Sequence, residues 1–88
     1  MVASYEVWSV LGCMACQEVE ERLVRIGVPF EKKELGTVVR NEVPDSEVMA
    51  QLIMQDNMAP VVVAVKDDGS RQSIPHSALP KEEAVCAA

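Results

Sequence analysis

Two cysteines separated by two residues stand out in the segment LGCMACQEVEERL, residues 11–23. A pair at this spacing can bind a soft metal, exchange electrons as a dithiol, or form a structural crosslink. Cys13 and Cys16 open a predicted helix, where unpaired N–H groups and the helix dipole lower the pKa of a thiol. We therefore predict Cys13 as a nucleophilic thiolate and Cys16, one turn further along and more buried, as the resolving thiol. Two core cysteines that never react remain the structural alternative.

The composition predicts one small domain spanning residues 1–88, with 49% hydrophobic residues and therefore a real core. The net charge of −6 argues against nucleic acid as a partner, because phosphate binding needs clustered bases. The absence of an 18-residue apolar run predicts no membrane span. Three cysteines and an N-terminus without signal-peptide features predict a cytoplasmic protein, and we expect a monomer. The third cysteine, Cys86, is expected to have no role, although a regulatory or dimer-forming thiol is the alternative.

The elements that would position the cysteines come from the first 34 residues. Residues 4–10 alternate and are rich in strand formers, which predicts a strand. Gly12 permits a sharp turn into the helix, which is predicted to end at Gly27. The three- and four-residue spacing of its apolar residues predicts one apolar face, made of Cys16, Val19, Leu23 and Ile26. Residues 28–34 predict a second strand, placed at an edge of the sheet by its proline and parallel to the first.

The second half of the sequence predicts further elements before and after a strand that begins directly after Pro60. We expect, in order, a loop at 35–43, a helix from 44–45 to Asn57, strands at 61–66 and 71–74 joined by a DDGS turn, and a short helix at 81–86. The residues predicted to face the core from the second helix are Val48, Met49, Leu52 and Ile53. The predicted fold is α/β, in the order β-α-β-α-β-β-α, with a mixed four-stranded sheet and helices on both faces.

A second segment, NMAPVVV, predicts a substrate-binding element made of Met58, Ala59 and Pro60. Proline has no N–H to donate. If its peptide bond is cis, the N–H and carbonyl of the preceding residue can face the cysteines and pair with a substrate backbone. An ordinary proline at the start of a strand is the alternative.

These residues resemble a known family. CMAC in a strand-to-helix turn, Met58-Ala59-Pro60-Val61 before a buried strand, and the short following strand resemble the thioredoxin fold in its glutaredoxin-like form. The nearest likeness is to the NrdH-redoxins, and it covers about residues 4–84, including a weaker match at Ser77-Ala78-Leu79-Pro80.

The resemblance implies a thiol-disulfide oxidoreductase whose usual role is to supply electrons to ribonucleotide reductase. It implies catalytic Cys13 and Cys16 and no cofactor beyond their disulfide. The residues that frame the pair, Gly12, Met14 and Ala15, are the supporting residues of the predicted site, and no metal is expected there.

The expected reductant follows from two departures from glutaredoxins. The segment SIPHSALPKEE lacks the Gly-Gly pair that helps those proteins to bind glutathione, and the residues after Cys16 include Glu18, Glu20 and Glu21. Acids at that place repel anionic glutathione. We therefore expect a flavoprotein of the thioredoxin reductase kind, with a ferredoxin-linked reductase as the other option.

Two other classes of function remain open. Heavy-metal-associated domains also place Cys-x-x-Cys between a first strand and a first helix, and thiolates select copper(I) or zinc. Those domains usually carry Met two residues before the first cysteine, where this chain has Leu11, and they lack a proline opening a later strand. The third class is a binding module that uses the same fold with idle thiols.

Overall fold

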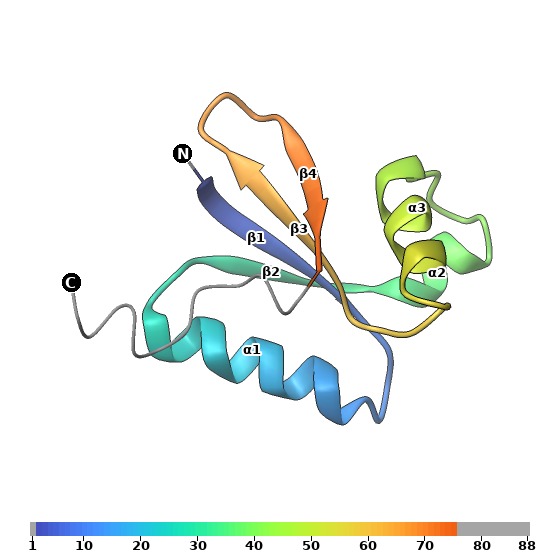
Figure 1. The fold of residues 1–88 in the computed structure, drawn as a ribbon, viewed down its shortest axis with the longest axis horizontal. Coiled ribbons are helices and arrows are strands. Elements are labelled where there is room, and N and C mark those ends of the chain that lie inside the picture. Colours follow the sequence, from blue (N-terminus) through green and yellow to red (C-terminus); the bar gives the residue numbers. More distant parts are fainter. Residues whose placement is uncertain (1, 76–88) are drawn as a thin grey trace.

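A four-stranded mixed sheet forms the middle layer of the molecule (Figure 1). The computed structural model describes residues 2–75. Its elements are β1 (Val2–Ser9), α1 (Met14–Ile26), β2 (Phe30–Glu34), α2 (Leu35–Val39), α3 (Ser46–Met54), β3 (Val61–Lys66) and β4 (Arg71–Ile74). The strand order is β2-β1-β3-β4; β1 is parallel to β2 and antiparallel to β3, and β4 is antiparallel to β3. The predicted parallel pair, its edge strand and the C-terminal hairpin are confirmed.

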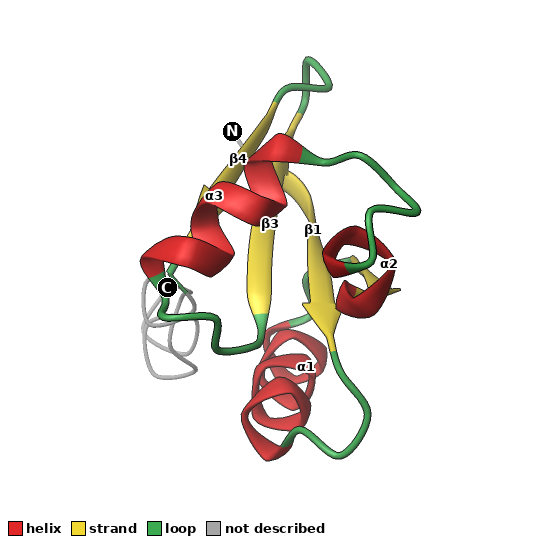
Figure 2. Ribbon diagram, turned by 90° about the vertical axis from the view of Figure 1, so that its right-hand side faces the viewer, coloured by secondary structure: helices red, strands yellow, loops and turns green. Residues whose placement is uncertain are grey.

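Helices cover both faces of this sheet, as predicted, with α1 on one side and α2 and α3 on the other (Figure 2). The alternation of β1 divides the core accordingly. Tyr5 and Val7 pack with the α1 residues Val19 and Leu23, whereas Trp8 packs with α2, α3 and the other side of β3. The central strand β1 is therefore buried on both faces, and it leads directly into the cysteine turn.

Helix α1 begins and ends where the sequence predicts. Cys13 is its N-cap, with extended backbone angles, and Gly27 is its C-cap in the left-handed region at φ 74°. The N–H of Gly27 donates to the carbonyls of Leu23 and Val24, which ends the helix with a glycine that meets no steric penalty. The predicted apolar face is confirmed, with Cys16 and Leu23 fully buried.

The predicted loop at 35–43 is wrong in its first half, because Leu35–Val39 form the short helix α2. Its sequence, LGTVV, contains glycine and β-branched residues, which are poor helix formers. Leu35 and Val38 are nevertheless buried against Trp8 and Val61. Tertiary packing therefore overrides the local preference, and the described order becomes β-α-β-α-α-β-β.

Helix α3 begins as predicted but ends earlier. The Asp45 carboxylate caps it by accepting the N–H of Val48 at 3.2 Å, and the helix ends at Met54 rather than at Asn57. Val48 and Leu52 face the core as expected, and Met49 is partly buried. The prediction for Ile53 is wrong, because its side chain is 65% exposed. Gln51 takes the inward place instead, since the buried positions follow the spacing 48, 51, 52.

The β3–β4 hairpin turns at Gly69, which adopts φ 87° and donates its N–H to the Lys66 carbonyl. No helix within residues 2–75 is long and apolar enough to cross a membrane. The predicted helix at 81–86, the weak match at 77–80 and Cys86 lie outside the described residues.

Candidate active site

The two cysteines lie at the end of the central strand, where the chain leaves β1 and enters α1 (Figure 1). The structure joins Cys13 and Cys16 by a disulfide, with their Cα atoms 5.2 Å apart. The turn that brings Cys13 into place contains Gly12 at φ 77°. The structure therefore brings together the two residues that the sequence predicts as catalytic.

The two cysteines differ in exposure. Cys16, in the first turn of α1, is only 1% exposed, whereas Cys13, the N-cap of the helix, is half-buried. The backbone N–H of Cys16 donates to the Cys13 sulfur at 3.0 Å, and the first turn of α1 contains no acidic residue. A reduced Cys13 at this place would have its negative charge stabilised by a helix N–H group and by the dipole. An incoming disulfide can reach Cys13, and Cys16 is placed behind it.

The Met58–Ala59–Pro60 segment lies at the same end of the sheet (Figure 2). Trp8 of β1 pairs with Val61 of β3, so the segment before β3 and the turn after β1 leave the sheet side by side. The Ala59–Pro60 peptide bond is cis, which is the conformation that the predicted substrate-binding role of this segment requires. Pro60 is fully buried and Met58 is exposed.

Apolar side chains frame the cysteines at the surface. Val10, Leu11 and Met14, which flank Cys13 in the chain, are all exposed, as is Met58. Of the predicted supporting residues, Gly12 and Ala15 are also exposed. Exposed apolar residues around a reactive group are typical of a surface that contacts another protein.

Two substitutions at Gly12 test whether this position needs glycine because of its backbone conformation or because of steric crowding. A Cβ added there would meet no atom within 4 Å, so only the positive φ opposes Gly12→Ala. We expect Gly12→Ala to lower the free energy of unfolding by about 1 kcal/mol, and Gly12→Asn to lower it by about half of that, because Asn tolerates this region better. Urea denaturation of both variants measures the difference. Equal losses would contradict the backbone explanation.

A groove of about 630 Å³ lies beside the cysteine turn, and the sequence analysis missed it. Val10 and Leu11 line one side, and the bases Lys32, Lys33 and Arg40 contribute from β2 and the end of α2. The parallel register pairs Val7 with Lys32 and Trp8 with Lys33, which brings these two lysines to the end of β1. The sequence predicted that these two strands are parallel but not their register, and the groove residues are separated along the chain.

The charge of this groove is mixed. Lys32 pairs with Glu20 at 3.5 Å, Lys33 with Glu31 at 3.7 Å, and Arg40 with Glu34 at 3.5 Å. The Lys33 ammonium also lies 5.3 Å from the centre of the Trp8 ring. These bases are partnered by acids and form no uniform positive surface.

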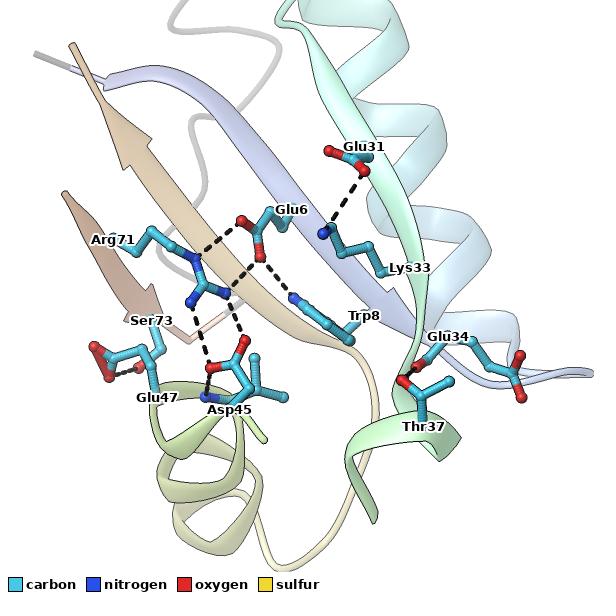
Figure 3. Close-up of polar contacts among 11 residues, drawn as sticks. Glu6, Trp8, Glu31, Lys33, Glu34, Thr37, Asp45, Glu47, Arg71 and Ser73 are labelled. Carbon is cyan, nitrogen blue, oxygen red and sulfur yellow. Dashed lines mark hydrogen bonds and ion pairs between the residues drawn. The ribbon is translucent and has the colours of Figure 1, made fainter. Parts of the chain in front are cut away.

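A partly buried network of ion pairs joins α3 to the sheet (Figure 3). The Arg71 guanidinium donates to both oxygens of Glu6, at 3.0 and 2.6 Å, and to Asp45 at 2.9 Å. The Trp8 indole N–H donates to Glu6 at 2.9 Å. No local sequence pattern predicts this network, because Glu6 and Arg71 are 65 residues apart.

The network also controls the protonation of its two acids. Burial alone would raise the pKa of Glu6, but hydrogen bonds from Arg71 and Trp8 outweigh it and hold this pKa below its ordinary value. Burial likewise opposes ionisation of Asp45, and Arg71 and the Val48 N–H lower its pKa overall. Both acids are therefore ionised at neutral pH, and the start of α3 is held against β4.

The described residues show which groups could hold a metal. Within residues 2–75, no three side chains of His, Cys, Asp or Glu gather closely enough to form a metal site. Cys13 and Cys16 supply two sulfur ligands of the four that a tetrahedral site needs.

Comparisons with known proteins add no relative. No family model matches the chain, and neither the curated proteins nor the solved structures contain a match.

Proposed function

We propose that this protein is a dithiol redoxin of the thioredoxin fold, which reduces disulfides of other proteins through Cys13 and Cys16. One observation carries the proposal: the cysteines form a disulfide at the start of α1, with Cys13 reachable and Cys16 buried. The mixed sheet with helices on both faces supports the fold assignment. The cis-Pro60 segment at the same end of the sheet supports a site for a protein substrate.

The reaction transfers two electrons from the dithiol to the client. The Cys13 thiolate attacks one sulfur of the client disulfide, which forms a mixed disulfide and releases the other client sulfur as a thiolate that takes up a proton. Cys16 then gives up its proton and attacks the Cys13 sulfur. The mixed disulfide breaks, the Cys13–Cys16 disulfide forms, and the client leaves with two thiols. An external dithiol reductase returns the pair to its reduced form.

The client and the reductant follow from the resemblance to NrdH-redoxins. On that basis the client is ribonucleotide reductase, and the reductant is a flavoprotein of the thioredoxin reductase kind or a ferredoxin-linked reductase. The segment 58–60 would hold the client strand while Cys13 attacks. Glutathione is not the expected reductant, because the chain lacks the Gly-Gly pair and the groove beside Cys13 has mixed charge.

Insulin reduction tests this function. The purified, metal-free protein is supplied with NADPH and thioredoxin reductase or, separately, with glutathione and its reductase, and insulin precipitation is followed. We expect turnover in the first system and little in the second. Turnover with glutathione alone would make the protein a glutaredoxin. No insulin reduction in either system, with copper or zinc retained by the protein as purified, would favour the metal chaperone instead.

A further inference from the structure

Gln55, which follows α3 as its C-cap, contacts the predicted substrate-binding segment at three points. Its side-chain nitrogen donates to the carbonyl of Met58 at 2.8 Å and to the carbonyl of Pro60 at 2.9 Å. Its own backbone carbonyl accepts the N–H of Met58 at 3.1 Å. One side chain therefore fixes the carbonyl groups on both sides of Ala59.

The orientation of this side chain is determined by its partners. The two carbonyl oxygens can only accept, so the NH2 end of Gln55 must face them. Its amide oxygen then accepts from the Gln51 side chain at 2.9 Å, and the Gln51 oxygen accepts from the Ser73 hydroxyl at 3.2 Å. A chain of hydrogen bonds thus runs from β4 through α3 to the segment before β3.

These bonds leave only Ala59 of the segment 58–60 with backbone groups free for further hydrogen bonds within the described residues. The carbonyls of Met58 and Pro60 are occupied by Gln55, the Met58 N–H is bonded, and proline has no N–H. Within residues 2–75, the N–H and carbonyl of Ala59 have no hydrogen-bond partner. A residue of a neighbouring strand can exchange both of its backbone bonds with such a residue.

We propose that Gln55 is the positioning residue that holds Ala59 ready to pair with the backbone of a client protein. The proposal rests on the proposed function, since it concerns how the protein disulfide is bound and not how Cys13 reacts. Gln55 makes no hydrogen bond to Cys13 or Cys16, so its loss should weaken client binding while leaving the reactivity of the thiol intact.

The test compares Gln55→Leu and Gln55→Glu with the control Gln72→Leu. The Leu variant removes the whole amide, and the Glu variant keeps an acceptor for Gln51 but has no donor for the two carbonyls. Gln72 is exposed on β4, so its variant makes the same chemical change away from the segment. Insulin reduction is measured with thioredoxin reductase, and attack on the small disulfide DTNB is measured on the reduced proteins.

We expect both Gln55 variants to raise KM for insulin about tenfold, with kcat and the DTNB rate changed by less than about twofold. The control should match the wild type. An unchanged KM would overturn the proposal, and so would an equal fall in the DTNB rate, because that pattern indicates general disruption.

A second readout separates this proposal from the proposed function. NMR order parameters of the Met58 and Ala59 amides should fall from about 0.85, a rigid backbone, to about 0.6 or less in Gln55→Leu. Order parameters that stay at the wild-type value would overturn the positioning role. A wild-type protein that does not reduce insulin would overturn the proposed function alone, and the order parameters would still decide the role of Gln55.

Discussion

The Cys13→Ser variant is expected to reduce insulin no faster than the uncatalysed reaction, a loss of about a thousandfold or more, because serine cannot form a mixed disulfide. The Cys16→Ser variant should fail in a different way. Its Cys13 can still attack, but no buried thiol is present to release the client. A covalent complex of protein and client should therefore accumulate and be visible on a non-reducing gel.

Cys86→Ser is the matched control for both variants, because it makes the same substitution at the third cysteine of the chain. We expect it to turn over like the wild type. Turnover by Cys13→Ser would contradict the assignment of the nucleophile. A mixed disulfide that forms through Cys16 in that variant would reverse the two roles.

Replacement of Arg71 should produce the largest loss of stability outside the core. Arg71→Met leaves the Glu6 carboxylate, 11% exposed, without its cation. Loss of one partner of a buried pair costs about 3–5 kcal/mol, and because the Arg71 side chain is 33% exposed we expect about 2 kcal/mol at pH 7. Trp8 is the single tryptophan and contacts Glu6, so its fluorescence reports urea unfolding directly.

The loss should depend on pH in a defined direction. The pKa values of Glu6 and Asp45 lie below their ordinary values in the folded protein, so their stabilisation is present above about pH 4 and disappears as the pH falls through the folded values. In Arg71→Met, burial instead favours the protonated form of Glu6. The difference between the wild type and the variant should therefore shrink between about pH 5 and pH 3.

Arg40→Met is the control for this experiment, because Arg40 and its partners Glu34 and Glu42 are all more than half exposed. It should leave the urea midpoint nearly unchanged at both pH values. A loss in Arg71→Met that is no larger than in Arg40→Met, or one that is the same at pH 3 as at pH 7, would contradict the role given to the network.

Local patterns predicted the elements that carry the cysteines. The strand formers of β1, the helical spacing from Cys16 to Leu23 and the stop at Gly27 are local features, and the structure confirms the strand and the helix. The burial of β1 on both faces was not predicted. The helix at Leu35–Val39 could not be predicted in this way, because its poor helix formers are held by burial against Trp8 and Val61. The prediction for Ile53 is wrong because it relied on hydrophobicity alone. Gln51 is buried in its place, because its side chain forms hydrogen bonds with Ser73 and Gln55.

The candidate site also contains residues that local motifs predict and residues that only the tertiary structure reveals. Cys13, Cys16 and Pro60 belong to short motifs, and the structure brings their segments to one end of the sheet. The groove bases and Gln55 require knowledge of which strands are neighbours and which carbonyls are unpaired. The bond between Arg71 and Glu6 requires the complete sheet, since β1 and β4 meet only through β3.

The most direct test of the central claim is a single turnover without any reductase. The protein is reduced, freed of reductant, mixed with an equal amount of oxidised insulin, and alkylated, and the free thiols of each cysteine are measured by mass spectrometry. We predict that Cys13 and Cys16 lose their two thiols together, that insulin gains two, and that Cys86 stays free. Thiols that remain on Cys13 and Cys16 while insulin stays oxidised would contradict the claim that this pair transfers electrons to protein disulfides.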